Sequence, residues 1–299
     1  MFARLALLAA LALAGCAAQT APTAPAAAPS GKALASACAN RDGWSDPAPP
    51  AKIFGNSYYV GTCGISVVLI DTPAGLVLID AATEEAAPSI LASIRALGFD
   101  PKNVRFLLTS HEHLDHVGGL KALQEATGAR VIARPEAVAA LTSGQPEATD
   151  PQRGGIPPFR GVTVARTVLD GEMLKIEKLR LTAHATPGHT PGGTSWTWRS
   201  CEGTDCRTIA YVDSLSAVSA DGYRFVDHPD YVATFRATFA KVEALPCEIL
   251  ITPHPGASTL FARLADPATL ANPESCRAYA AGARMRLADR LASESTPPK

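Results

Sequence analysis

The chain has 299 residues, with 27 Lys and Arg against 28 Asp and Glu, so its formal net charge is -1. Apolar residues make up 47% of it, which is enough for one sizeable core, and the length fits one domain or at most two. The near-neutral balance gives no basic surface for nucleic acid, so we expect no nucleic-acid partner. No internal stretch reaches the roughly 18 consecutive apolar residues of a membrane-spanning helix, which excludes a polytopic membrane protein.

The first residues predict an export signal. Arg4 gives a positive start, and the Leu and Ala run over residues 5–14 is long enough for a signal-peptide core but too short to span a membrane. The run ends in Leu13-Ala14-Gly15-Cys16, which resembles the lipobox of bacterial lipoproteins. We therefore predict a signal peptide over residues 1–15, lipidation of Cys16, and a periplasmic protein anchored in the outer membrane. The alternative is ordinary signal cleavage at one of the Ala-rich sites that follow.

The segment after Cys16 is rich in Ala, Pro, Thr and Ser as far as residue 37. Such a composition cannot bury a core and predicts a flexible tether, and its repeated prolines argue against a stable helix. We accordingly place the folded domain at residues 38–299.

The body of the chain alternates predicted strands and helices. Short runs of β-branched and aromatic residues predict strands at 57–62, 65–70, 76–79, 104–109, 130–133, 162–165, 179–185, 194–198, 208–212 and 248–252. Helical spacing of apolar residues predicts helices at 84–97, 120–126, 231–245 and 274–291. This order favours an α/β fold of two packed sheets with helices outside. Residues 143–160 are rich in Gly, Pro and polar types and are expected to form a surface loop.

Six cysteines remain after Cys16 is set aside: Cys38, Cys63, Cys201, Cys206, Cys247 and Cys276. An even number in an oxidising compartment indicates disulfides, although six cysteines allow fifteen pairings. Cys201 and Cys206 lie between two predicted strands, so this pair can bridge a hairpin. Sequence order alone would then pair the others as neighbours along the chain. A metal role for Cys201 and Cys206 is the alternative, but it lacks a second pair of ligands nearby.

Three clusters of histidine lie directly after predicted strands. The first is His111-Glu112-His113-Leu114-Asp115-His116, a density of potential ligands that chance would seldom produce. The second and third place His189 and His254 in rigid Pro/Gly turns. Together these clusters offer five histidines and one aspartate, enough for two metal ions with three protein ligands each. Three ligands leave an open position on each metal, which is typical of a catalytic zinc rather than a structural one.

The pattern His111-x-His113-x-Asp115-His116 with His189 and His254 resembles that of the metallo-β-lactamase superfamily. Within it the chain is similar to subclass B3 and to the Adelaide imipenemase branch, through the segments 59–66 and 187–198, Cys201 with Cys206, and residues 213–215. The resemblance implies an αββα sandwich. It also implies one Zn²⁺ on His111, His113 and His189 and a second on Asp115, His116 and His254. Disulfides at Cys38–Cys63, Cys201–Cys206 and Cys247–Cys276 are implied as well.

The same resemblance implies that Ser214 and Ser216 bind the carboxylate of the substrate. The alternative for Ser216 is that its hydroxyl bonds the backbone of a turn. Asp213 is ambiguous, because an aspartate near this position bridges both metals in glyoxalase II-like relatives, within a Gly-Asp pair. Val212 replaces that glycine here, so we favour a structural or ligand-supporting role for Asp213.

Other candidates are assigned ordinary structural roles. We expect His184 to be a strand histidine with a hydrogen-bond partner. His228 precedes Pro229 and is expected to open a helix. Trp196 and Trp198 are expected in the core. Glu112 falls outside the ligand pattern and is expected either in solvent or supporting the ligands.

The implied activity is hydrolysis of penicillins, cephalosporins and carbapenems, conferring antibiotic resistance. A metal-bound hydroxide oriented by Asp115, with His116 beside it, would attack the lactam carbonyl. The chain holds no Ser-x-x-Lys, Lys-Thr-Gly or Gly-x-Ser-x-Gly segment for an activated serine. Alternatives are another hydrolase of the same fold, such as a glyoxalase II-like thioesterase or a lactonase, and a zinc-binding lipoprotein without turnover. We expect a monomer.

Overall fold

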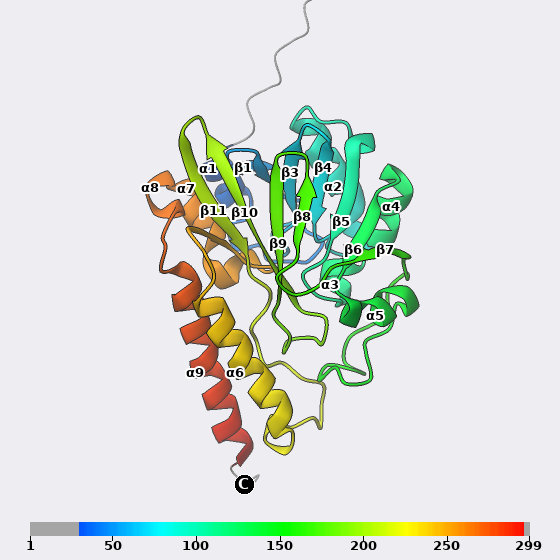
Figure 1. Ribbon diagram of the computed structural model, residues 1–299, viewed down its shortest axis with the longest axis vertical. Coiled ribbons are helices and arrows are strands. Elements are labelled where there is room, and N and C mark those ends of the chain that lie inside the picture. Colours follow the sequence, from blue (N-terminus) through cyan, green and yellow to red (C-terminus); the bar gives the residue numbers. More distant parts are fainter. Residues whose placement is uncertain (1–29, 296–299) are drawn as a thin grey trace, which may run out of the picture.

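Two β-sheets form the centre of the computed structural model, which describes residues 30–295 (Figure 1). The first has seven strands in sequence order: β1 (Ala51–Phe54), β2 (Ser57–Tyr59), β3 (Val68–Thr72), β4 (Gly75–Ile79), β5 (Val104–Leu108), β6 (Arg130–Ala133) and β7 (Val164–Thr167). It is an antiparallel meander as far as β4, and its remaining pairs are parallel.

The second sheet has five strands in the order β12, β11, β10, β9, β8. They span Met173–Ile176 (β8), Leu179–Ala185 (β9), Thr194–Glu202 (β10), Asp205–Tyr211 (β11) and Ile249–Ile251 (β12). All neighbours are antiparallel except β11 and β12, which are parallel because α6 connects them.

Three apolar clusters define four layers. The largest lies between the sheets and includes Tyr59, Ile79, Leu181 and Trp196. A second packs the outer face of the first sheet against α2 (Ala87–Ala96), α4 (Leu120–Thr127) and α5 (Val138–Ser143). A third packs the outer face of the second sheet against α6 (Pro229–Glu243) and α9 (Ser275–Ser295). The two helical layers lie on opposite sides of the sheets in Figure 1, so the expected αββα sandwich is confirmed.

Shorter helical segments connect these layers. They are α1 (Gly31–Ala37), α3 (Leu114–Val117), α7 (Leu260–Ala265) and α8 (Pro267–Leu270), together with 3₁₀ turns at Glu84–Ala86, Pro101–Asn103, Pro135–Ala137, Phe225–Asp227 and Pro255–Ser258. In the part of the chain that the structure describes, no helix has the length and apolar character needed to cross a bilayer.

The two core tryptophans behave as the sequence predicts. Trp196 is fully buried and Trp198 nearly so, both on β10. Their indole N–H groups donate to the Thr109 carbonyl and to the Ser57 hydroxyl, each at 2.9 Å, which ties the second sheet to the first. Buried indole nitrogens need such partners, and both have one.

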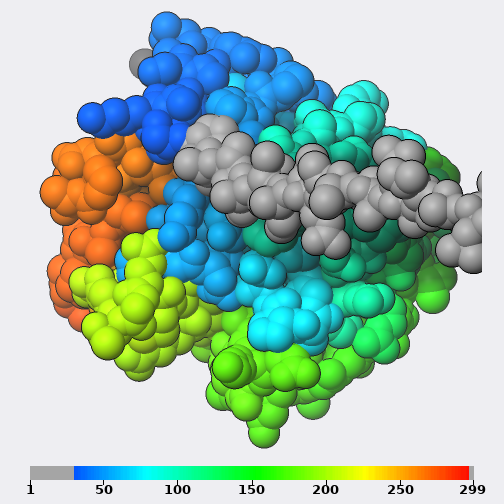
Figure 2. Space-filling model, turned by 90° about the horizontal axis from the view of Figure 1, so that it is seen from above, coloured from blue at the N-terminus to red at the C-terminus, as the bar shows by residue number. Residues whose placement is uncertain are grey.

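The predicted tether extends too far, because residues 31–37 form helix α1. Ser30 caps it by accepting from the Ala33 N–H, and the side chain of Leu34 is completely buried. Gly31 lies so close to the Leu264 backbone of α7 that a Cβ there would clash, and Figure 2 shows the blue first folded residues against the orange α7–α8 region. The prolines that argue against a helix all precede Ser30, so the folded domain begins before residue 38.

Strands β1 and β8 are further additions to the expected set, each four residues long. Several predicted boundaries also shift: the strand expected at 65–70 begins at Val68, and the helix expected from residue 84 begins with a 3₁₀ turn before α2. The predicted start of a helix at His228-Pro229 is confirmed, since Pro229 is the first residue of α6.

The structure contains three disulfides among the described residues, and they are the expected ones. Cys38–Cys63 fastens the end of α1, Cys201–Cys206 joins β10 to β11, and Cys247–Cys276 attaches α9 to the segment before β12. The alternative metal role for Cys201 and Cys206 is thereby excluded. Cys16, with the predicted signal peptide and most of the tether, lies outside the described residues.

Candidate metal centre

The six predicted metal ligands meet at one end of the sandwich. His111 follows the end of β5, and His113, Asp115 and His116 lie at the start of and within the single-turn helix α3. His189 follows β9 and His254 follows β12. Because the ends of these strands lie at the same edge of the two sheets, residues far apart in the sequence converge there.

The first group consists of His111, His113 and His189. All three are buried, and one potential ligand atom from each lies within 4.8 Å of the others. The rings meet edge to face, with centroids 4.7 to 5.0 Å apart. This arrangement brings one nitrogen of each of the three imidazoles close enough together to bind the same metal ion.

Each of these imidazoles has one nitrogen engaged by a neighbour. Nδ1 of His111 donates to Oδ1 of Asp213 at 2.7 Å, and Nε2 of His113 donates to Oδ2 of Asp150 at 2.9 Å. Nδ1 of His189 donates to the Ser216 carbonyl at 2.9 Å. A donor nitrogen fixed in this way leaves the lone pair on the opposite nitrogen of the ring, which is the form that binds metal. At His189 the Gln152 amide lies 3.4 Å from that nitrogen.

The second group consists of Asp115, His116 and His254. Oδ2 of Asp115 lies 3.0 Å from Nε2 of His116 and 3.3 Å from Nε2 of His254, and the two nitrogens are 3.3 Å apart. Ligand atoms on a tetrahedral zinc, each about 2.1 Å from the ion, are about 3.4 Å from one another. The spacing of the three atoms therefore matches a zinc site.

Burial and neighbouring charges lower the pKa values of His111 and His189 and so favour their neutral imidazoles. Burial lowers the pKa of His189 to about 3, with the nearby His113 adding to the effect. Burial likewise lowers the pKa of His111 well below its ordinary value, and His116 and His189 lower it further. Neutral imidazoles at physiological pH offer lone pairs to a metal without first losing a proton.

The surroundings of the second group instead stabilise positive charge. Burial opposes the shift, but Asp115 and Asp80 together raise the pKa of His116 to about 10. Burial would raise the pKa of Asp115, yet the charge and hydrogen bond of His116 hold it well below its usual range. Two carboxylates thus face one buried imidazole, an environment that attracts positive charge.

A divalent metal fits these residues. Nε2 of His111 is buried and has no hydrogen-bond partner among the described residues, which is costly unless something binds it. Imidazole nitrogens with one carboxylate are the donor set that zinc accepts. The six side chains therefore support two neighbouring metal positions.

The remaining predicted site residues lie around this centre. Ser214 is buried directly after Asp213, and the Ser216 hydroxyl lies 3.2 Å from Nδ1 of His189. Asp213 contacts the far side of His111, away from Nε2, which supports the ligand-holding role that we favour over a bridging one. His184 lies on β9 and bonds the Thr197 hydroxyl at 2.8 Å, as expected of a structural histidine.

Several functional residues escape the sequence analysis. Asp150 and Gln152 belong to the predicted surface loop but are buried, and Gln152 contacts His189 at 3.4 Å. Glu112 is completely buried, so the solvent-exposed alternative is wrong. Its carboxylate accepts from the Thr190 hydroxyl and the Gly192 N–H, both at 2.8 Å, and so joins two ligand-bearing loops.

Comparison with known proteins agrees with this geometry. The family model described as "Metallo-beta-lactamase superfamily" matches residues 60–201. The crystal structure of the metallo-β-lactamase MIM-1 from Novosphingobium pentaromativorans superposes with a TM-score of 0.86 at 51% identity, covering 88% of this chain and 98% of that one. MEM-A1, a subclass B3 metallo-β-lactamase from a soil metagenome library, has a TM-score of 0.81 at 44% identity, with 85% and 99% covered.

Curated relatives include a hydroxyacylglutathione hydrolase of Brucella anthropi, 29% identical over 232 residues, which are 77% of this chain and 75% of that protein. The solved structures are similar at higher identity and over nearly their whole length. The chain therefore belongs to the metallo-β-lactamase superfamily and, within that superfamily, to subclass B3.

Proposed function

We propose that this protein is a zinc-dependent β-lactamase that opens the lactam amide of penicillins, cephalosporins and carbapenems and so confers antibiotic resistance. The observation that carries the proposal is the convergence of five histidines and one aspartate into two adjacent groups of potential ligand atoms. The likeness to MIM-1 and MEM-A1, whose names describe them as metallo-β-lactamases, supports it.

Two zinc ions per chain are part of the proposal. His111, His113 and His189 would hold the first, and Asp115, His116 and His254 the second. Zinc at such positions lowers the pKa of a coordinated water to about 7 and polarises a bound carbonyl. Asp115 has a low pKa and stays ionised, so its carboxylate can accept and orient a proton of the attacking water.

The surroundings of the metal centre provide the contacts that would hold the substrate. We assign Ser214 and Ser216 to the carboxylate that β-lactams carry. A hollow of about 510 Å³ opens beside His254 and is lined by Trp44 and Phe261, among others. Trp44 is 43% exposed, so its indole offers an apolar surface for a substrate side chain.

A glyoxalase II-like thioesterase is the competing activity, and the hydroxyacylglutathione hydrolase match is its support. In such relatives an aspartate near position 213 bridges the metals. Here Oδ1 of Asp213 accepts from Nδ1 of His111, the nitrogen opposite the potential ligand atom Nε2. This contact favours the lactamase.

Purified protein incubated with nitrocefin, imipenem, aztreonam and S-D-lactoylglutathione separates the two activities. We expect hydrolysis of nitrocefin and imipenem, with aztreonam and the thioester spared. Replacing a proposed ligand, as in His189→Ala, should lower turnover more than about 100-fold. The matched control His184→Asn, at a partly buried histidine outside the centre, should retain activity. Thioester hydrolysis with intact β-lactams would refute the proposal.

We also propose that the protein is a periplasmic lipoprotein of the Adelaide imipenemase branch, monomeric and anchored in the outer membrane through Cys16. The lipobox-like Leu13-Ala14-Gly15-Cys16 and the three disulfides support export to an oxidising compartment. Cys16→Ala should move the protein from the membrane to the soluble periplasmic fraction. A variant that still sediments with membranes would contradict the anchor.

A further inference from the structure

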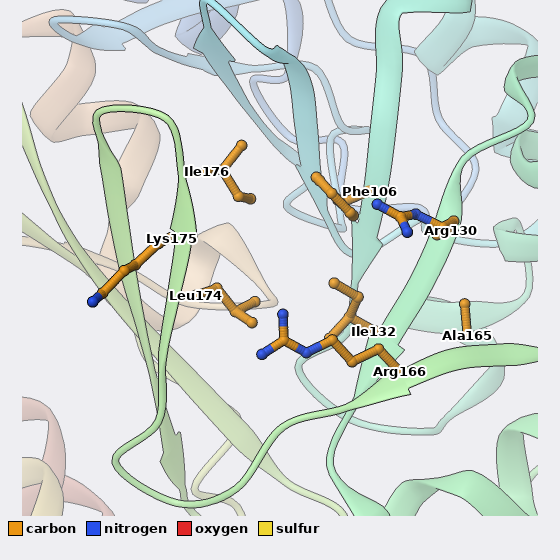
Figure 3. A pocket seen from close by; sticks show the side chains of 8 residues that line it. All are labelled: Phe106, Arg130, Ile132, Ala165, Arg166, Leu174, Lys175 and Ile176. Carbon is orange, nitrogen blue, oxygen red and sulfur yellow. The ribbon is translucent and has the colours of Figure 1, made fainter.

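A cleft opens at the edge of the sandwich, away from the metal centre. It lies between β8 of the second sheet and strands β5, β6 and β7 of the first, and its volume is about 230 Å³ (Figure 3). Since β7 and β8 are the last strands of their sheets, this edge exposes the core between the sheets. Ile132, Leu174 and Ile176, all members of that core, form the floor with Phe106.

Two guanidinium groups stand at the mouth of the cleft. The Arg130 guanidinium lies 4.9 Å from the ring centroid of Phe106, and Arg166 reaches toward Leu174 in Figure 3. Glu172 pairs with Arg166 and neutralises part of its charge. The Lys175 side chain points away from the cleft in the same view.

An adjoining hollow shares Phe106 and Arg130 and adds one charge of each sign. Arg105 contributes a cation and Glu177 a carboxylate. Across both spaces, three arginines face two carboxylates, so the mouth carries a net positive charge above an apolar floor. A cationic mouth over an apolar floor is complementary to a molecule with an apolar body and one anionic end.

The cleft is separate from the metal centre in the fold. It uses Phe106 within β5 and Arg130 and Ile132 within β6, whereas the metal ligands follow the carboxyl ends of β5, β9 and β12. Occupation of the cleft therefore need not involve the proposed catalytic residues.

We propose that this edge cleft is a binding site for small amphipathic carboxylates, such as a medium-chain fatty acid. The alkyl chain packs on Phe106, Ile132, Leu174 and Ile176, and the carboxylate pairs with Arg130 and Arg166 at the mouth. The small volume selects a single chain rather than a whole phospholipid.

Isothermal titration calorimetry with octanoate, hexanoate and butanoate tests whether the alkyl chain packs on the apolar floor of the cleft. We expect affinity to rise up to about fourfold for each added CH₂ until the cleft is full. Octylammonium and octanol, with the same chain but a positive or no charge, should bind much more weakly than octanoate. Amide shifts in ¹⁵N NMR spectra should fall on β6 and β8. Equal binding of octylammonium, or shifts confined to other elements, would overturn the site.

Variants at the mouth of the cleft test its role in octanoate binding, and they leave the residues of the metal centre unchanged. Arg130→Gln and Arg166→Gln should each weaken octanoate binding by up to about fivefold, as expected of a partly exposed ion pair. Ala165→Trp places a large side chain at an exposed lining position and should block binding. Arg95→Gln removes the same charge from an exposed position on α2 and should change nothing. Unaltered octanoate affinity in Ala165→Trp, with thermal stability retained, would refute the proposal whether or not the protein hydrolyses β-lactams.

Discussion

Asp150 offers a sharp test of how the loop at 143–160 supports the metal centre. Its carboxylate is fully buried, and it accepts from Nε2 of His113 at 2.9 Å while also accepting from the Gln152 N–H at 2.8 Å. The first bond orients the His113 ring, and the second holds the loop against it. Asp150→Asn keeps the shape of the side chain but removes its charge, and Asp150→Ala removes both bonds.

The expected loss of zinc affinity follows from the kind of contact that each Asp150 variant removes. Carboxylates that orient a metal-binding histidine contribute about 10- to 100-fold to metal affinity, which corresponds to about 1.4 to 2.7 kcal/mol. A buried hydrogen bond to a charged group is worth a similar amount, about 1.5 to 3 kcal/mol. We therefore expect Asp150→Ala to weaken zinc binding by about 100-fold and Asp150→Asn by about tenfold.

Competition between the protein and a chromophoric chelator measures zinc affinity directly. Glu147→Gln is the matched control, because it removes a carboxylate from the same loop without a contact to a metal-binding histidine. The control should bind zinc like the native protein. Zinc affinity within twofold of native in both Asp150 variants, with the fold intact, would refute the argument that this carboxylate positions His113.

Three further predictions concern stability. Leu34→Ala should lower the free energy of unfolding in urea by about 2 to 5 kcal/mol, because the Leu34 side chain of α1 is completely buried. An unchanged free energy of unfolding would show that α1 does not pack on the core. Replacing Cys247 and Cys276 together by Ala should cost about 3 to 4 kcal/mol, since the bridge spans 29 residues, and an unchanged melting temperature would contradict this. Burial lowers the pKa of His184, so the unfolded chain takes up a proton at this residue first and the stability of the fold decreases as the pH drops below about 6.5. In metal-free protein, His184→Gln should therefore reduce the pH dependence of stability. A pH profile identical to that of the native protein would contradict this.

The convergence of the candidate metal ligands can be predicted from the sequence, because most are rare residue types placed in a loop directly after a strand. His111, His189 and His254 follow β5, β9 and β12, and strand ends at one edge of a sandwich necessarily come together. The two-sheet architecture is predictable for the same reason: apolar runs of strand length, alternating with amphipathic helices, have few ways to bury their surfaces.

Residues that support the ligands are harder to predict, because their role depends on a contact with a distant residue. Asp150 lies in a polar, Gly- and Pro-rich segment whose composition gives no sign of burial, yet it meets His113 37 positions away. Glu112 is separated by 80 residues from the Gly192 amide that it accepts from. Helix α1 is missed because its Ala-rich sequence resembles the composition of the segment before it, and its packing against α7 joins residues far apart in the chain.

The central claim is that six side chains from distant parts of the chain hold two zinc ions. Diffraction from crystals grown with zinc, collected on both sides of the zinc absorption edge, tests it most directly. Two adjacent anomalous peaks are expected, one bonded to His111, His113 and His189 and the other to Asp115, His116 and His254. A single peak enclosed by four protein ligands, or zinc bound elsewhere with these six side chains unoccupied, would contradict the account.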